Sequence, residues 1–275
     1  MFTRWLNHYH DTDMKRITSR DNPTFKGLKA LGEDAREQRR QGMTLIEGCH
    51  LVAAYRDKLG QPERLILSEH GFEQAEIQAL CETLPNVEKL LLRDSLFREI
   101  SDLATPTGVC AAIRIPSPQT SSASGSCVLL DALQDTGNVG SILRSAAAAG
   151  IIDVFLGPGC AGAWTPRVLR AAQGAHFGLR LHEQADLAEV MARFSGATLA
   201  ATAHGGEPLY RHDLTGNVAW LFGSEGGGIN PSLEAIASKR AMIPLVVGSE
   251  SLNVAAAAAI CLFEEVRQKA AWARR

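Results

Sequence analysis

Residues Ile243 to Phe263 read I-P-L-V-V-G-S-E-S-L-N-V-A-A-A-A-A-I-C-L-F, and this stretch decides the fold class. Its apolar start, Ile243 to Val247, predicts a buried strand, Gly248 to Glu250 a turn, and Ser251 the N-cap of a long alanine-rich helix. A strand that turns directly into a helix is typical of an α/β protein. Ligands of such proteins bind outside the carboxyl ends of the strands, where we expect the capping side chains.

Two earlier stretches carry further polar residues among glycines. Asp131 to Ala149 contains D-x-x-x-D-T-G-N-V-G-S-I-L-R, and Leu221 to Asn230 reads L-F-G-S-E-G-G-G-I-N. Taken alone, Ser251 and Asn253 have a purely structural interpretation, because capping residues are common at helix starts. The three stretches together favour a functional site.

In this order, N-x-G-x-x-x-R, then G-S-E-G-x-G, then I-P followed by S-L-N, the stretches resemble the motifs of the TrmH (SpoU) family of RNA 2′-O-methyltransferases, in the SPOUT superfamily. The resemblance extends from about Arg16 to about Lys269. It implies an α/β domain with a trefoil knot, in which the C-terminal segment passes through a loop formed by the preceding strands. It also implies a homodimer formed through that domain. Periodicity alone predicts an ordinary open sheet, because knots are rare exceptions.

Length and composition describe an ordinary globular protein. The chain has 275 residues, which favours two domains, since a domain usually takes about 100 to 200 residues. Charged residues make up 21% and apolar residues 45%, and the formal net charge is −2. A net charge so close to zero gives no global sign of a nucleic-acid partner, so any RNA surface must be a local patch.

The cysteines and the apolar runs indicate the compartment. The six cysteines lie singly and form no C-x-x-C pair, so neither a zinc site nor a disulfide framework is indicated, and we expect no metal. The N-terminus lacks the apolar core of a signal peptide, and the longest apolar run, Val254 to Phe263, is too short to span a bilayer. We therefore expect a cytoplasmic protein without a membrane partner.

Composition shifts divide the chain into an arm (1–13), a small domain (14–115), a linker rich in serine and proline (116–126) and a larger domain (127–275). Short strands and helices alternate in the small domain, which predicts an α/β/α arrangement. Its expected strands are Thr44–Glu47, Arg64–Ser68, Val87–Leu92 and Val109–Ile113. Its expected helices run to about Arg40 and over Leu51–Leu59, Phe72–Leu84 and Ser95–Ile100.

A basic stretch opens the small domain. Eight lysines and arginines against four acids between Lys15 and Arg40 give a local net charge of +4, which fits either a solvated helix face or contact with phosphates. The series I-T-S-R-D-N-P-x-x-K, L-I-E-G and T-P-x-G-V resembles the substrate-binding domain of many TrmH-family enzymes, which is similar to small ribosomal proteins that bind kinked RNA. The candidate RNA-binding residues are Arg16, Arg20, Lys26 and Lys29.

The larger domain begins with a predicted strand, Cys127 to Leu130, and a helix that we expect Asn138 to cap. Arg144 should reach back over Gly140, because helical side chains lean toward the N-terminus. Its partner is either a structural carboxylate or an RNA phosphate. Further strands are expected at Ile151–Leu156, Phe177–Leu181, Thr198–Thr202 and Val218–Phe222.

Two glycine-rich loops have rival interpretations. G-P-G-C-A-G at residues 157–162 matches the dinucleotide fingerprint in form, but Trp164 intervenes before Pro166 can start a helix, and no acid follows at the right distance. G-S-E-G-G-G at 223–228 lacks the G-K-[ST] of a phosphate-binding loop, and its Glu225 would repel a triphosphate. We expect neither loop to bind nucleotide phosphates in those ways.

The resemblance implies S-adenosylmethionine as the methyl donor and assigns site residues. Cofactor-binding positions are Gly223, Ile243 and Leu252, with Thr202 a weaker candidate. Catalytic positions are Arg144, Glu225, Ser251, Asn253 and Asn138. The family arginine has been proposed as the base, but a guanidinium stays protonated in proteins. Our hypothesis is that Arg144 clamps an RNA phosphate, Ser251 and Asn253 orient the ribose, and Glu225 orients the arginine or its loop.

The expected function is therefore ribose 2′-O-methylation of structured RNA. Ribosomal RNA is favoured over transfer RNA, because the small domain resembles that of ribosomal-RNA enzymes in the family. One alternative is a non-catalytic or resistance-type RNA-binding protein of the same fold. Another is a SPOUT enzyme that methylates a base nitrogen.

Overall fold

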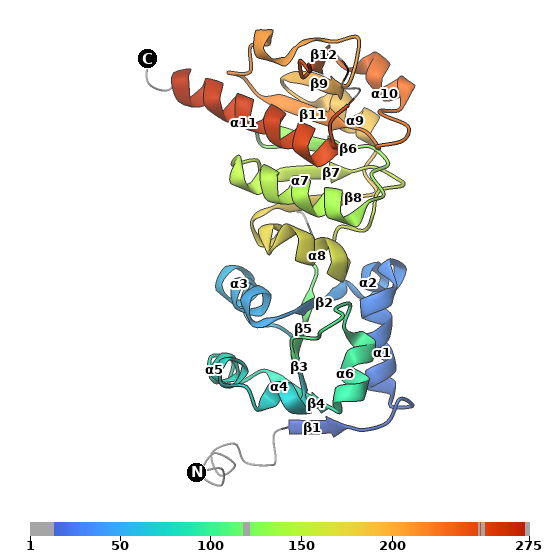
Figure 1. Ribbon diagram of the computed structural model, residues 1–275, viewed down its shortest axis with the longest axis vertical. Helices are drawn as coiled ribbons and strands as arrows, with labels where there is room; N and C mark the ends of the chain where they lie inside the picture. The colour runs from blue at the N-terminus through green and yellow to red at the C-terminus, as the bar shows by residue number, and fades with distance from the viewer. Residues whose placement is uncertain (1–13, 118–121, 247, 249–250, 273–275) are drawn as a thin grey trace. The chain divides into compact units, whose positions relative to one another are not determined.

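The computed structural model describes residues 14–117, 122–246, 248 and 251–272 (Figure 1). Contacts divide the chain into two compact units. The first contains the residues up to Pro116 together with Trp164–Arg170, and the second contains Ser117–Ala163 and Ala171–Arg275. The expected arm at 1–13 and the centre of the linker at 118–121 lie outside the described residues.

The first unit is built on a five-stranded mixed sheet with the order β1-β4-β3-β5-β2. Its strands are β1 (Met14–Ile17), β2 (Met43–Glu47), β3 (Arg64–Ser68), β4 (Glu88–Leu92) and β5 (Val109–Arg114). Its helices are α1 (Pro23–Glu33), α2 (Ala35–Gln41), α3 (Cys49–Leu59), α4 (Glu69–Phe72), α5 (Ala75–Glu82) and α6 (Asp94–Ile100). Apolar residues of α1 and α6, among them Phe25 and Phe97, pack on one face of the sheet, whereas α3 contacts β2, β5 and α5.

The second unit is built on a seven-stranded sheet with the order β10-β12-β9-β11-β6-β7-β8, and every recorded pairing in it is parallel. Its strands are β6 (Cys127–Leu130), β7 (Asp153–Leu156), β8 (Arg180–Glu183), β9 (Ala197–Thr202), β10 (Glu207–Pro208), β11 (Val218–Phe222) and β12 (Lys239–Met242). Its helices are α7 (Thr136–Ala148), α9 (Leu187–Arg193), α10 (Pro231–Ile236) and α11 (Val254–Trp272). Helix α8 (Pro166–Ala172) and the 3-10 turns η1 (Ala175–Gly178) and η2 (Leu209–Arg211) complete the elements.

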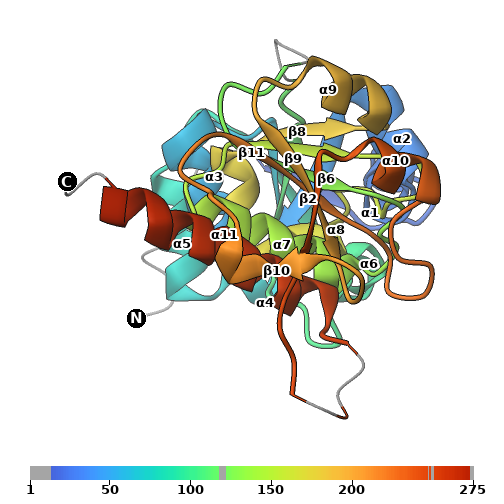
Figure 2. The ribbon, with the colours of Figure 1, turned by 90° about the horizontal axis from the view of Figure 1, so that it is seen from above.

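Helices cover both faces of the parallel sheet. Residues Leu129, Phe155 and Leu221 form a core with Leu187 of α9 and Ile229 before α10. On the other face α7 and α11 lie side by side, and both ribbon views, Figure 1 and Figure 2, show this pair. Alternate residues of the buried strands thus face opposite helix layers, which is why these strands read as continuous apolar runs.

Helix α11 is tied to the sheet by a buried polar contact. Trp220 is fully buried, and its indole N–H donates to a carboxylate oxygen of Glu265 at 2.5 Å. Ser126 and Lys269 engage the other oxygen of this carboxylate. Within the described part of the chain, no helix combines the length and the apolar character needed to cross a membrane.

The strand expected at Ile243–Val247 is wrong. The strand in this region is β12, Lys239–Met242, which pairs with β9 and β10. Pro244 has no N–H to donate to a ladder, so the strand ends before it. Val247, Ser249 and Glu250 lie outside the described residues, so the turn expected there has no structural account.

Two expected helix caps are also wrong. Asp135, not Asn138, caps α7, and its carboxylate accepts from the backbone N–H of Asn138 at 2.7 Å. Helix α11 is capped by Asn253 instead of Ser251, because the Asn253 side-chain oxygen accepts from the amides of its second and third residues. Each true cap lies within three residues of the expected one.

The first unit departs from expectation in three places. The helix expected to run to Arg40 is interrupted at Asp34, which ends α1 and caps α2. The helix expected over Phe72–Leu84 is two shorter helices, α4 and α5. Strand β1 was not expected, because Lys15 and Arg16 are charged and exposed on an edge strand, which conceals its alternation.

Candidate active site

The carboxyl ends of four neighbouring parallel strands, β12, β9, β11 and β6, share one edge of the second sheet. Thr202 ends β9 and lies opposite Met242, the last residue of β12, so Ile243 follows at the same level. Gly223 directly follows β11. Three of the four expected cofactor-binding residues therefore lie at one edge, where open α/β sheets bind their ligands.

Side chains of all three motifs meet through Asn138. The Asn253 side-chain Nδ2 donates to Oδ1 of Asn138 at 2.9 Å. The Nδ2 of Asn138 donates in turn to Oε1 of Glu225. These partners are 115 and 87 residues apart in the chain, so the fold alone brings them together.

The caps of two helices hold this set in place. Asn253 accepts from the amides of Ala255 and Ala256 at 3.0 and 3.2 Å, which fixes it on the first turn of α11. Asp135 holds the backbone of Asn138 in the first turn of α7. Both helices thus begin at the carboxyl edge of the sheet with their first amides near the set.

The glycine-rich loop that carries Glu225 is closed on itself. Ser224 and Gly228 exchange two backbone hydrogen bonds of 3.0 and 2.9 Å. Gly223 allows this turn, because a Cβ there would lie 2.2 Å from the carbonyl carbon and oxygen of Gly228. The Asp131 carboxylate accepts from the amide of Asn230 at 2.6 Å and ties the end of the loop to β6.

Asp131, Asp135 and Asn230 were not identified as site residues from the sequence. Asp135 had a usable signal, since an aspartate directly before the first residue of a helix is a common N-cap. Asp131 had none, because its bond to the Asn230 amide spans 99 residues.

Arg144, Ser251 and Leu252 do not join the hydrogen-bonded set. Arg144 is exposed on α7, and the described residues give its side chain no hydrogen bond or ion pair. It lies six residues after Asn138, or roughly 9 Å along the helix axis. Arg144 was expected to pair with either a structural carboxylate or an RNA phosphate. No carboxylate pairs with it among the described residues. Ser251 and Leu252 are exposed beside Asn253.

The Thr202 side chain has a buried hydroxyl at the carboxyl edge of the sheet. Its hydroxyl oxygen is buried, and no hydrogen-bond partner for it exists among the described residues. A buried hydroxyl without a partner is costly, so it fits a site that a polar ligand group completes. Together with the amides around Gly223, the residues present suit a ligand with hydrogen-bonding groups and flat apolar parts, such as an adenosyl group.

The expected RNA-binding residues of the first unit are mostly paired within the protein. Arg20 and Lys29 both contact Glu99, at 2.5 and 3.5 Å, and Lys26 lies 3.2 Å from Asp21. Arg16 is exposed and has no ion pair within the described chain. The local charge of +4 is therefore partly neutralised, and Arg16 is the most available of the four.

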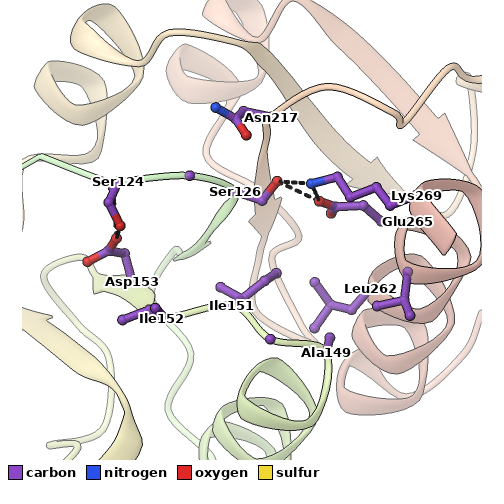
Figure 3. A pocket seen from close by; sticks show the side chains of 13 residues that line it. Ser124, Ser126, Ala149, Ile151, Ile152, Asp153, Asn217, Leu262, Glu265 and Lys269 are labelled. Atoms are coloured by element: carbon purple, nitrogen blue, oxygen red, sulfur yellow. Dashed lines mark hydrogen bonds and ion pairs between the residues drawn. The ribbon is translucent and has the colours of Figure 1, made fainter. Parts of the chain in front are cut away.

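A hollow of about 310 Å³ opens at the opposite, amino edge of the same sheet (Figure 3). Asp153 lies in it and receives two hydrogen bonds from Arg180, at 2.6 and 2.7 Å, and one from the Ser124 amide. Burial alone would raise the pKa of Asp153, but these hydrogen bonds leave that pKa below its usual value. Glu265 is likewise satisfied, so the buried carboxylates here are fully paired and belong to the framework.

Side chains that could bind a metal ion are scattered over the described part of the chain. No group of three or more histidine, cysteine, aspartate or glutamate residues gathers there in a way that could hold a metal ion. The cysteines are poor nucleophiles, since burial raises the pKa of Cys127 and of Cys261 to about 12. The site is a set of amides, a carboxylate and helix N-termini.

Known proteins share both units. Residues 125–263 match the SpoU rRNA Methylase family, and residues 22–111 match the MRM3-like substrate binding domain. The chain is 31% identical over 254 residues to the 23S rRNA (guanosine(2553)-2′-O)-methyltransferase RlmP of Bacillus subtilis. The aligned region covers 91% of this chain and 98% of that relative.

Solved structures agree with this. A putative TrmH-family RNA methyltransferase from Porphyromonas gingivalis is 31% identical with a TM-score of 0.75, covering 89% of this chain and 97% of its own. The SpoU methyltransferase AviRb from Streptomyces viridochromogenes, solved with AdoMet, has a TM-score of 0.82 at 24% identity, covering 90% and 98%. At that identity the second likeness concerns the fold alone.

The parallel sheet with three motif loops at one edge, preceded by a substrate-binding domain, defines an RNA methyltransferase of the α/β class. This chain belongs to the SpoU rRNA methylase family. The resemblance seen in its sequence motifs is thereby confirmed.

Proposed function

We propose that this protein methylates the ribose 2′-oxygen of a nucleotide in ribosomal RNA, with S-adenosylmethionine as donor. The hydrogen bonds that join Asn253, Asn138 and Glu225 support this most, because they make one site of three separate motifs. The relatives named as 23S rRNA 2′-O-methyltransferases favour ribosomal RNA and ribose over a base nitrogen.

The donor, when bound, supplies a methyl group on a positively charged sulfur. We place its adenosyl part against Thr202, Gly223, Ile243 and Leu252, where backbone groups and the buried Thr202 hydroxyl would hold it. The protein must also hold the ribose hydroxyl in line and accept the hydrogen bond that it donates.

Arg144 has the properties of a phosphate clamp. Its exposed guanidinium, which has no partner among the described residues, can make two parallel hydrogen bonds to a phosphate of the RNA. Such a clamp would fix the target nucleotide without taking part in proton removal. Ser251, exposed beside Asn253, would contact the ribose.

Three further properties are part of this proposal. The second unit forms a trefoil knot, the protein is a homodimer through that unit, and it works in the cytoplasm. The functional boundaries follow the composition: an arm at 1–13, a substrate domain at 14–115, a linker at 116–126 and the methyltransferase domain at 127–275. Arg16, Arg20, Lys26 and Lys29 would contact RNA, with Arg16 the most available.

The function is tested with purified protein, donor labelled in the methyl group and ribosomal RNA from cells that lack the protein. Nuclease digestion of the product separates 2′-O-methylated nucleotides from methylated bases. Label in a 2′-O-methylated nucleotide supports the proposal. Label in a base would support base methylation, and RNA binding without transfer would support the non-catalytic alternative.

A further inference from the structure

The direction of every hydrogen bond in the active-site set can be deduced from one fixed point. Backbone amides only donate, so the Asn253 atom that faces the amides of Ala255 and Ala256 must be its oxygen. The nitrogen of Asn253 then faces Asn138, and since it can only donate, it meets the Asn138 oxygen. The Asn138 nitrogen is left for Glu225, which must accept.

These hydrogen bonds leave few side-chain acceptors of the set free for a ligand. Two amides occupy both lone pairs of the Asn253 oxygen, so Asn253 has no acceptor left for a substrate hydroxyl. Glu225 uses one oxygen for Asn138, and its other oxygen has no partner among the described residues. Glu225 is exposed at the strand edge, so this second oxygen is open to a ligand.

We infer that Asn138 is a positioning residue that sets Glu225 as the hydrogen-bond acceptor for the ribose hydroxyl of the RNA. The inference rests on the proposed function. It changes two roles assigned from the sequence. Asn253 orients Asn138 and not the ribose, and Glu225 contacts the substrate and does not orient Arg144. A carboxylate is the strongest acceptor in the set, and hydrogen bonds to charged groups are about twice as strong as neutral ones.

Substitutions that reverse the polarity test this directly. Asn138→Asp still accepts from Asn253 but turns a carboxylate toward Glu225. Two facing carboxylates share a proton at low pH and repel each other when both are charged. Carboxyl groups titrate near pH 4, and a shared proton raises the pKa of one member of such a pair, so we expect the thermal midpoint and the turnover of this variant to fall relative to the wild type as pH rises from about 4 to about 7.

The double variant Asn138→Asp with Glu225→Gln separates position from charge. The amide introduced at position 225 can donate to the carboxylate introduced at position 138, so the hydrogen bonds re-form and the thermal midpoint should recover at all pH values. Turnover should remain about 100-fold or more below the wild type, because the charged acceptor now lies at position 138. Glu225→Gln alone keeps the bond from Asn138, so it should keep the midpoint and lose turnover to a similar degree.

Asn22→Asp is the matched control, because Asn22 caps α1 through its side-chain oxygen and an aspartate caps equally well. Its thermal midpoint should not fall with rising pH. A midpoint for Asn138→Asp that does not fall relative to the wild type with rising pH, or recovered turnover in the double variant, would overturn the inference. If the wild type transfers no methyl group, the proposed function fails, while the dependence of the midpoint on pH still judges the hydrogen-bond direction.

Discussion

Asn138 connects segments of the chain that have no local reason to meet. Its neighbours in the set, Asn253 and Glu225, come from a helix start and from a glycine-rich loop. Arg144, on the same helix as Asn138, stays outside the set and faces solvent. At this scale the site is a hydrogen-bonded group of amides and a carboxylate, and the exposed Arg144, further along α7, suits a clamp on a phosphate.

Replacing Arg144 with lysine tests the clamp. Lysine keeps the charge but loses the planar fork that binds a phosphate with two hydrogen bonds, so we expect turnover to fall about 10- to 100-fold. Affinity for the donor, measured by calorimetry, should change little. The control is Arg193→Lys on α9, where an exposed pair with Glu189 should tolerate the change. Near-normal turnover of the Arg144 variant would refute the assignment.

The starts of the helices and the loop between them decide where the site forms. Asp135 is the N-cap of α7, and Asn253 is the N-cap of α11. The loop after β11 folds back at Gly223, which lies close to Gly228. The sequence indicated that helices begin near these points, but it misplaced both caps. An N-cap is chosen by the geometry of the first turn, and several neighbouring polar residues compete for it.

Gly223→Ala should disrupt the loop. Its Cβ would overlap the Gly228 carbonyl, and relieving so close a contact costs about 1 to 3 kcal/mol or more. We expect a lower thermal midpoint and weaker donor binding. Gly226→Ala is the matched control in the same loop, because a Cβ there meets nothing within 4 Å. Equal effects of the two substitutions would show that the close approach at Gly223 does not matter.

Asp135→Ala should remove the cap of α7 at a cost of about 1 kcal/mol in unfolding free energy, measured by urea denaturation. Turnover should also fall, because Asn138, which positions Glu225, loses its backbone anchor. Asp186 caps α9 in the same way, by accepting from the Glu189 amide at 3.1 Å, away from the set. Asp186→Ala should therefore cost similar stability with no change in turnover. A loss of turnover in both variants would mean that general destabilisation is responsible.

For the whole molecule, the sequence predicted the α/β class and the family, because long apolar strands and three ordered motifs are local signals. It misplaced the strand before the third motif, since I-P-L-V-V is apolar while β12 reads K-R-A-M and is chosen by its pairing with β9. It placed Arg144, Asn138 and Glu225 in one site. Only the fold reveals that Asn138 and Glu225 touch, and that Arg144 stands apart.

Stability should depend on pH through a histidine of the second unit. His176 is buried, and burial lowers its pKa to about 4. Below about pH 6.5 this histidine is protonated in the unfolded chain but stays neutral in the folded protein. The free energy of unfolding therefore decreases as pH falls from about 6.5 to about 4, by on the order of 3 kcal/mol in total. His176→Gln should flatten this part of the stability curve. The exposed His204→Gln should leave it unchanged, and an unchanged curve in the His176 variant would contradict the assignment.

The central claim is that three motif loops at one sheet edge form a single pocket for a methyl donor. Calorimetric titration of the full-length protein with S-adenosylmethionine tests it most directly, in parallel with the Gly223→Ala and Gly226→Ala variants. The account predicts one donor molecule bound per chain, with binding lost in the first variant and kept in the second. Absence of donor binding by the wild-type protein would contradict it.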